Sequence, residues 1–142
     1  FRYAIEIVAT AKKASAPKAE SRYPSLPDAE EHLSRVRRLC LAFPGAEEKL
    51  SHGASTFFTP KKVFAMFADN VHGDGYLGLW LPASPGVQET LLAASPHAYF
   101  FPPYVGVKGW IGARLDRMGD EELGERISEA WRLMTAKKPR KR

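Results

Sequence analysis

Residues 101–116 constrain the fold of this 142-residue chain more than any other stretch. The stretch contains two consecutive prolines at 102–103, whose rings restrict the backbone and predict a stiff, extended segment. Gly106 and Gly109 follow, and glycines at this spacing allow a tight bend that places Lys108 at its tip. We therefore expect a strand to begin directly after a sharp bend.

The residues after this bend alternate in character, as the residues of a half-buried strand do. One face of the predicted strand is apolar and consists of Ile111, Ala113 and Leu115. The other face consists of Trp110, Gly112 and Arg114. The apolar face predicts contact with the core, and the Trp/Arg face predicts contact with solvent or a partner. A second interpretation of the Trp/Arg face is a small second core beneath a helix at 85–95.

Length and composition favour a single domain that buries a core without disulfides or metal. The one cysteine, Cys40, cannot form an internal disulfide, and its place on an apolar helix face predicts a core residue rather than a nucleophile. No apolar run approaches the roughly 20 residues of a membrane span. Glu6 interrupts the short apolar run at the start, so no signal peptide is expected. We expect a cytoplasmic protein that does not enter membranes.

The formal net charge of +5 comes from the two ends of the sequence. Residues 1–27 hold five Lys or Arg and two acids, residues 137–142 hold five Lys or Arg, and residues 28–136 hold eleven Lys or Arg and fourteen acids. The composition predicts a disordered tail over 1–27, a domain over 28–137 and a short basic tail over 138–142. A basic tail binds phosphate non-specifically, whereas the domain itself carries no basic excess.

Three helices are predicted from apolar residues that recur at helical spacing. They cover residues 29–43, 85–95 and 120–136. Asp28 and Asp120 are expected to cap the first and third helices, and Glu31 completes a capping box with Asp28. Pro85 suits the first position of the second helix. The buried side of this helix is expected to carry Val87, Leu91, Leu92 and Ala94.

Strands are predicted where β-branched and aromatic residues cluster between turn residues. They cover residues 55–59, 63–68, 76–81 and 110–115, with a short extended piece at 97–101. Residues 46–53 are predicted to be a polar connection, and residues 60–62 a hairpin turn with two lysines at its tip. We therefore expect an α+β fold whose antiparallel sheet has about four to five strands, with the first and last helices on one face.

Several short motifs resemble the MmcQ/YjbR family. In the first half they are Phe43-Pro44-Gly45-Ala46-Glu47-Glu48, Ser51-His52-Gly53, Thr56-Phe57-Phe58 and Lys62-Val63-Phe64-Ala65. In the second half they are Pro102-Pro103-Tyr104, Gly106, Lys108-Gly109-Trp110, Leu115-Asp116 and Glu129-Ala130-Trp131-Arg132-Leu133. Together these motifs place the resemblance over about residues 30–137.

The resemblance implies a fold similar to the frataxin/CyaY type. It also implies DNA binding by a "double wing" of projecting hairpins. In frataxin-like proteins an acidic ridge on the first helix serves iron. Here that helix has Glu30 and Glu31 near its start, followed by Arg35, Arg37 and Arg38. No metal and no cofactor is therefore expected.

Seven residues form the candidate binding set: Lys61, Lys62, Lys108, Tyr104, Trp110, Arg114 and His52. The lysines at the two bends are candidates for phosphate contacts, although lysines at hairpin tips also serve solubility. The Trp/Arg face is a candidate for phosphate contact or base stacking. The position of His52 before a strand favours a structural role. No arrangement of Ser, His and Asp or of paired carboxylates follows from the sequence, so enzymatic activity is not expected.

Three functions are compatible with these residues. The first is a monomeric DNA-binding protein that contacts phosphate through its hairpin tips, the Trp/Arg face and the basic C-terminal tail. The second is a module for a small anionic ligand, with an aromatic pocket anchored by Lys108 or Arg114. That pocket would be lined by Tyr76, Trp80, Tyr104 and Trp110. The third is a protein-interaction domain with an exposed aromatic sheet face.

Overall fold

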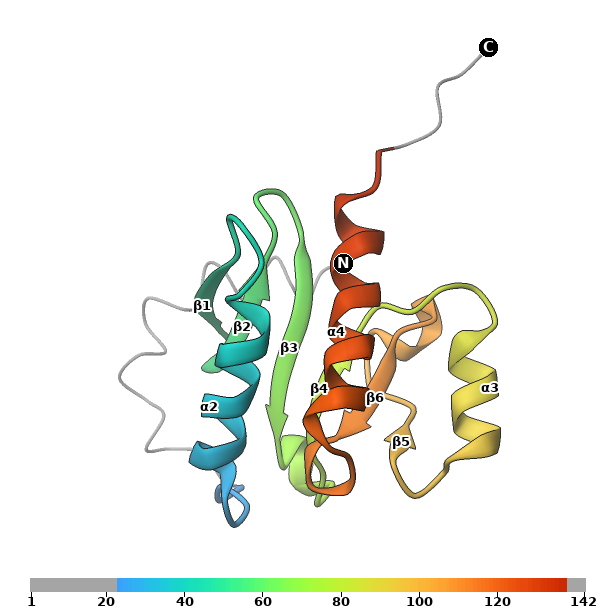
Figure 1. Cartoon of the computed structure of the whole chain (residues 1–142). Coiled ribbons are helices and arrows are strands. Elements are labelled where there is room, and N and C mark those ends of the chain that lie inside the picture. Colours follow the sequence, from blue (N-terminus) through green and yellow to red (C-terminus); the bar gives the residue numbers. More distant parts are fainter. Residues whose placement is uncertain (1–22, 138–142) are drawn as a thin grey trace.

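A computed structural model describes residues 23–137 of the chain as an α+β domain with a six-stranded antiparallel sheet (Figure 1). The strands are β1 (Glu47–Ser51), β2 (Ala54–Phe58), β3 (Val63–Asp69), β4 (Leu77–Leu81), β5 (Tyr99–Phe100) and β6 (Ile111–Arg114). The helices are α2 (Ala29–Cys40), α3 (Val87–Ala94) and α4 (Asp120–Thr135), and the short 3-10 turns are η2 (Val71–Gly73), η3 (Gly106–Lys108) and η4 (Leu115–Arg117). The predicted fold class is confirmed with a slightly higher strand number. Most of the two predicted tails, residues 1–22 and 138–142, lies outside the described residues.

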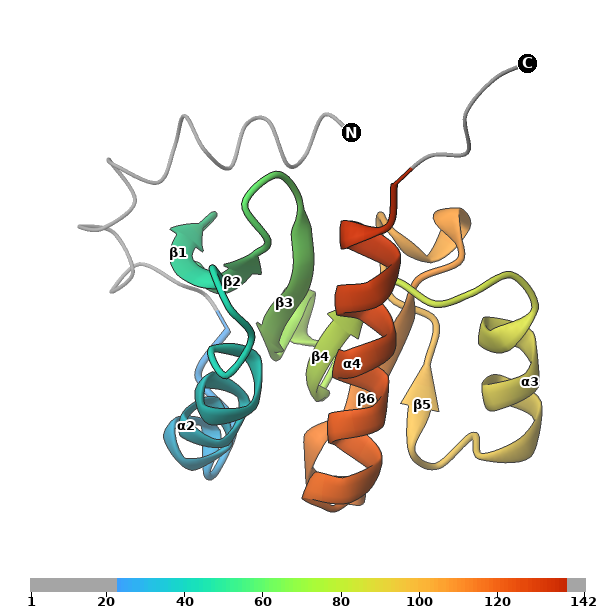
Figure 2. The ribbon, with the colours of Figure 1, turned by 45° about the horizontal axis from the view of Figure 1, so that its top comes forward.

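The strand order is β1-β2-β3-β4-β6-β5, and every neighbouring pair is antiparallel. Strand direction therefore assigns each connection to one end of the sheet. The β2–β3 turn, the C-terminal end of β4 and η3 lie toward one end, which we call the hairpin end. The β1–β2 turn, η2 and η4 lie at the opposite end. Because α4 starts after η4 and runs back along the sheet, its C-terminus reaches the hairpin end (Figures 1 and 2).

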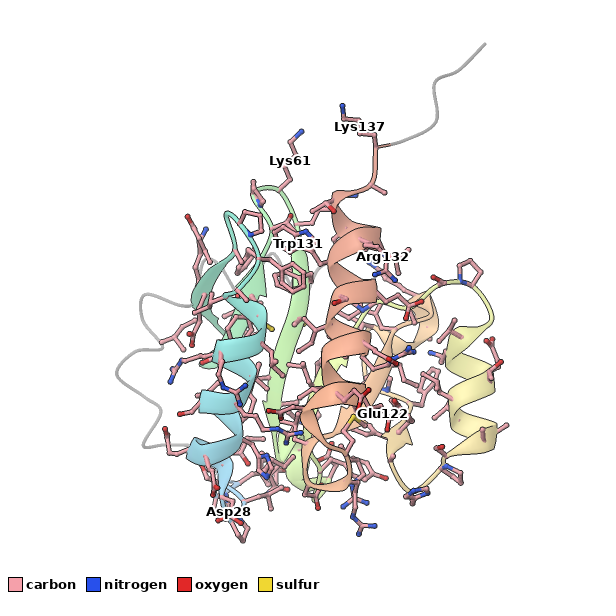
Figure 3. The ribbon with its side chains drawn as sticks, in the orientation of Figure 1. Asp28, Lys61, Glu122, Trp131, Arg132 and Lys137 are labelled. Atoms are coloured by element: carbon pink, nitrogen blue, oxygen red, sulfur yellow. The ribbon has the colours of Figure 1, made fainter. Side chains whose placement is uncertain are left out.

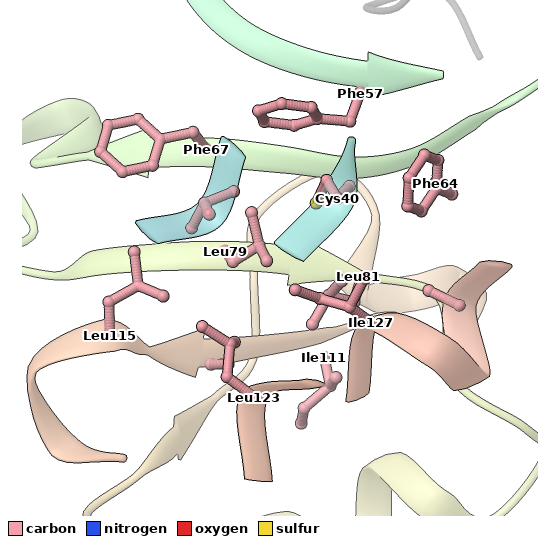
Figure 4. Close-up of a cluster of buried hydrophobic side chains, with 14 of the residues drawn as sticks. Cys40, Phe57, Phe64, Phe67, Leu79, Leu81, Ile111, Leu115, Leu123 and Ile127 are labelled. Carbon is pink, nitrogen blue, oxygen red and sulfur yellow. The ribbon is translucent and has the colours of Figure 1, made fainter. Parts of the chain in front are cut away.

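The main core lies between the sheet and helices α2 and α4, which cover one face as predicted (Figure 2). Figure 4 shows the side chains of both layers meeting there, including Phe57, Leu79, Leu81, Ile111, Leu123 and Ile127. The predicted leucine face of β4 and the apolar face of β6 both point into this cluster. Cys40 is also buried in it, and burial raises the pKa of its thiol, which confirms a core role.

Residues 47–51, predicted as part of a polar connection, are instead an edge strand, β1, which pairs with β2 along its whole length. The sequence pattern hides this strand because an edge strand tolerates charged residues on both faces. Glu48 of β1 accepts two hydrogen bonds from the guanidinium of Arg37, at 2.7 and 3.0 Å. Burial alone would raise the pKa of Glu48, but the hydrogen bonds from Arg37 and Ser55 bring it below its usual value.

The first and third helices start at residues 29 and 120 as predicted, but their predicted caps, and the start of the second helix, differ from the structure. Asp28 has a left-handed backbone (φ 66°) and makes no side-chain capping bond, because that conformation differs from the extended one that aims a cap at the first amides. Helix α3 begins only at Val87, after Gly86, and Ser84 is held instead by Glu129 (Oγ to Oε2, 2.8 Å). Asp120 is the first helical residue of α4, and the capping position is Gly119.

Asp120 joins α2 to α4 instead of capping its own helix. Its two carboxylate oxygens accept hydrogen bonds from Arg35 Nε and from Arg38 Nη2, the latter at 3.0 Å. Arg35 also donates to the carbonyl oxygens of Leu115 (2.8 Å) and Met118 (2.6 Å). The bonds from the two arginines lower the pKa of Asp120 below its ordinary value of 3.8. The folded domain therefore favours the charged carboxylate.

We expect Asp120→Asn to unfold at a lower urea concentration than the wild type near neutral pH. A lowered folded-state pKa stabilises above the unfolded value, and this stabilisation is lost as the pH falls through the folded value. The difference between the two proteins should therefore shrink as the pH drops below 3.8. Urea titrations across this range measure it, with Glu121→Gln as a control acid in the same helical turn. A difference that persists undiminished at the lowest pH would contradict the assignment.

Candidate functional site

The two lysines of the β2–β3 turn project from a rigid support. Thr59 is buried, and its Oγ1 accepts hydrogen bonds from the backbone amides of Lys61 (3.1 Å) and Lys62 (2.8 Å). The Thr59 amide also donates to the carbonyl oxygen of Lys62 (2.7 Å). These hydrogen bonds hold the backbone of the turn in place. Both lysines are exposed, as predicted for residues at a hairpin tip.

The fold brings further cations to the hairpin end. Figure 3 shows Lys61 and Lys137 projecting at this end, with Arg132 on the last turns of α4 below Lys137. Lys108, in η3, is exposed toward the same end. Two acids on β1 and α4 are already paired with cations: Glu47 with Lys49 (3.8 Å), and Glu129 with Arg126 (3.4 Å). The hairpin end thus presents lysines from three segments, namely the β2–β3 turn, η3 and the residues that follow α4.

Acidic side chains collect toward the opposite end of the domain. The first turns of α2 and α4 start there and carry most of them, including Glu122, which Figure 3 labels. Asp116 of η4 adds another. They are Glu30, Glu31, Asp120, Glu121 and Glu122. The net charge counted from the sequence shows no basic excess for the domain as a whole. Along the long axis, lysines gather at the hairpin end, whereas at the opposite end the six acids outnumber the arginines that lie among them, Arg35, Arg38, Arg114 and Arg117.

The predicted Trp/Arg face forms a second small core instead of an open surface. Trp80 is only 2% exposed and packs on this sheet face in a cluster to which Trp110 adds a half-buried ring. The cluster contains Met66, Ala68, Trp80, Phe100 and Val105, with Val63, Val71, Tyr76 and Trp110 against it. This agrees with the alternative interpretation of the face. However, Leu91 and Leu92 of α3 pack on the main core, so α3 does not cover the second one as predicted.

Two glycines make room for the ring at the centre of this second core. The Phe100 ring lies so close to Gly78 and Gly112 that a Cβ on either residue would fall 2.8 or 2.5 Å from it. Tyr76 stacks on the Phe100 ring (centroids 4.2 Å apart), and the Arg114 guanidinium lies over Tyr76 at 5.1 Å. Arg114 is therefore mostly covered and sits near Asp116, away from the hairpin-end lysines. Its Nε, like the Nε1 of Trp80, is buried without a hydrogen-bond partner.

Tyr104 lies in a turn rather than at the end of the extended segment predicted for Pro102 and Pro103. The Gly106 amide donates to the Pro102 carbonyl (3.0 Å), and Tyr104 has a positive φ of 65°. Its hydroxyl and the Nε2 of His72 lie 2.6 Å apart. The bend predicted at Gly109 is present, with φ 94°. Tyr104 is thus directed toward η2, at the opposite end from the β2–β3 lysines.

His52 is also distant from the lysines. It forms the β1–β2 turn with Gly53, and both residues have positive φ (53° and 76°), as a two-residue hairpin turn requires. The predicted set therefore divides into four parts: the lysines at the hairpin end, Trp110 and Arg114 against the second core, Tyr104 beside η2, and His52 in the β1–β2 turn.

A buried glutamine that the sequence analysis overlooked holds the 101–110 segment in place. Gln88 of α3 donates from Nε2 to the carbonyl oxygens of Gly106 (2.8 Å) and Trp110 (2.6 Å). Helical periodicity suggested that Ala94 would be buried on this helix, yet Ala94 is exposed and Gln88 is buried. In the sequence, the only sign that Gln88 would be buried was the position of this polar residue directly after Val87.

Two shallow hollows run along α4, of about 400 and 580 Å³. Both are lined mainly by charged residues of α4, including Glu121, Glu125 and Arg126, and neither contains a residue of the aromatic pocket predicted for an anion. Within residues 23–137, His, Cys, Asp and Glu form no group of three or more that could hold a metal ion. No helix in this range is long and apolar enough to cross a membrane.

A family model, YjbR, matches residues 41–133. The chain belongs to the YjbR family. The structure is similar to the crystal structure of a Deinococcus radiodurans protein with a DUF419 domain, with a TM-score of 0.62 and 24% identity over 74% of this chain and 79% of the other. That likeness supports the fold. No curated protein matches the chain.

The YjbR match covers all six strands and most of α4, so it includes Lys61, Lys62 and Lys108. Lys137 lies beyond it. The hairpin end of this YjbR protein is therefore built partly from the family region and partly from the chain that follows.

Proposed function

We propose that this YjbR protein binds nucleic acid through its hairpin end, as a monomer and without a catalytic step. The supporting observation is the convergence of Lys61, Lys62 and Lys137 on one end of the domain, with acids collected at the other (Figure 3). Cations held together on a rigid support neutralise adjacent phosphates and release counterions, which is the main source of affinity for nucleic acid.

The uneven distribution of charge would also orient the protein as it approaches nucleic acid. An acidic end is repelled by a polyanion while a basic end is attracted, so the field of the protein steers the hairpin end toward phosphate. The sequence of residues 138–142 adds four Lys or Arg directly after Lys137. The proposed interface contains the hairpin lysines of the sequence prediction and replaces Trp110 and Arg114, which the second core holds, with the C-terminal end of α4.

Fluorescence anisotropy of a labelled oligonucleotide tests the proposal when it is repeated over a range of salt concentrations. Each phosphate contact contributes about 0.9 to the slope of log K against log salt for a duplex and about 0.7 for a single strand. Removal of residues 138–142 should reduce the slope but leave measurable binding, because the lysines of the folded domain remain. Binding that disappears entirely on this truncation would assign the affinity to the tail and contradict a role for the hairpin end.

A further inference from the structure

The segment between β5 and β6 exposes apolar side chains beside Lys108, toward the hairpin end of the domain. Phe101 is 52% exposed and Val107 is 84% exposed, and both are large hydrophobic residues. Lys108 follows Val107 in η3. Large exposed apolar groups that lie together in a folded domain mark contact sites.

The Phe101 ring rests on a backbone that has no space for any side chain. A Cβ at Gly106 would lie 2.6 Å from the ring, so the ring packs directly against this glycine. We call Phe101 on Gly106 the Phe101 platform. Part of the ring covers the glycine, and the remaining exposed fraction is available to a flat partner.

The backbone beneath the platform is held from several directions. Gln88 donates to the carbonyl of Gly106, and the Gly106 amide donates to the carbonyl of Pro102. Phe100, directly before the platform, pairs with Gly112 of β6 and is buried. The backbone that carries Phe101 is therefore held, and a side chain on a held backbone loses less conformational entropy when it binds than one on a mobile loop.

An exposed aromatic ring on a well-held backbone, with a lysine in the same segment, has the chemistry of a single-strand binding surface. Successive unpaired bases stack on aromatic side chains while a basic surface follows the phosphates. In a duplex the base faces are stacked within the helix, so a ring of this kind finds no partner there without unstacking.

We propose that Phe101 is a stacking platform for an unpaired base and that this protein binds single-stranded nucleic acid in preference to duplex. This inference rests on the proposed function. It assigns the aromatic contact to Phe101, a residue outside the seven predicted from the sequence. It assigns the phosphate contacts to Lys108 of the same segment and to the other lysines of the hairpin end.

Anisotropy measurements on the full chain test the inference with a labelled DNA strand of about 20 nucleotides and the duplex of the same sequence, a length that exceeds the site size of most single-strand binding folds. We expect the single strand to bind at least about tenfold more tightly. Phe101→Leu, which keeps an apolar side chain but removes the ring, should weaken single-strand binding by a factor of about 5 to 150 and leave duplex binding unchanged. Phe101→Tyr keeps the ring and should retain the wild-type affinity. Urea unfolding verifies that both variants fold.

Two other outcomes would overturn the inference in distinguishable ways. In the first, strand and duplex bind equally, Phe101→Leu matches the wild type, and loss of the lysines weakens binding. The stacking role of Phe101 is then wrong, and the proposed function stands. If neither nucleic acid binds the wild type, both the stacking role of Phe101 and the proposed function fail.

Discussion

Gly112→Ala is expected to destabilise the domain by about 3 kcal/mol, the upper end of the usual cost of overpacking. The new Cβ would lie 2.5 Å from the Phe100 ring. The ring cannot move away, because Tyr76 stacks on it at 4.2 Å between centroids. The strand also cannot move, because Gly112 is paired with Trp80 of β4 on one side and with Phe100 on the other. Urea unfolding followed by tryptophan fluorescence measures the loss.

A matched glycine and a double mutant make this prediction specific. Gly124 lies within α4, and a Cβ added to it would meet nothing within 4 Å, so Gly124→Ala should stabilise by about 0.4–1 kcal/mol. Phe100→Ala alone should cost about 3–5 kcal/mol. Combined with Gly112→Ala, it should cost less than the sum by about 2 kcal/mol, because the ring that the Cβ meets is gone. Strict additivity would show that the two residues do not compete for the same space.

The core and the faces of the strands follow from the sequence, because burial leaves a period of two in strands and of 3.6 in helices. Leu77, Leu79 and Leu81 lie in the main core as their alternation predicts, and Leu123 and Ile127 do so on α4. The division of β6 into an apolar face and a Trp/Arg face is also confirmed. These features are local, so a single sequence is enough to predict them.

The contents of the second face could not be predicted, because they depend on residues that fold onto it from elsewhere. Phe100 comes from β5, which pairs with β6 at the edge of the sheet, and only this pairing turns the Trp/Arg face into a core. The placement of Arg114 over Tyr76 follows from the same packing. A strand pattern shows which residues share a face but not which distant side chain will cover it.

The lysines of the hairpin tips were predicted as phosphate contacts, but that the C-terminal end of α4 joins them could not be predicted, for a similar reason. Lys61 and Lys137 lie far apart in the sequence, and the charge of the domain sums to no basic excess. Only the strand order and the direction of α4 bring them to one end and take the acids of α2 and α4 to the other. A charge total cannot reveal this separation, and periodicity does not report which ends of the elements meet.

Reversal of charge at the hairpin end is expected to have the largest functional effect. In Lys61→Glu/Lys62→Glu/Lys137→Glu, three cations become anions at exposed positions outside both cores. Each lost contact with a single strand removes about 0.7 from the salt slope, and repulsion by the new carboxylates adds to the loss. We expect affinity for single-stranded DNA to fall at least about 100-fold at about 50 mM salt. Stability should stay within about 0.5 kcal/mol of the wild type, as for most surface substitutions.

A control at the opposite end separates local contacts from net charge. Arg117→Glu changes the formal charge as much as Lys61→Glu does, but it lies in η4 beside Asp116. Lys61→Glu should weaken binding markedly, whereas Arg117→Glu should have little effect beyond a small change in long-range attraction. Equal losses in the two single variants would mean that only net charge matters.

The salt dependence of single-strand binding by the wild type and the triple variant is the most direct test of a basic hairpin end. We predict that the slope of log K against log salt falls by about 2 in magnitude in the variant, because three phosphate contacts on a single strand are lost. A variant that binds with the wild-type slope and affinity would show that Lys61, Lys62 and Lys137 do not contact nucleic acid, and would contradict the account.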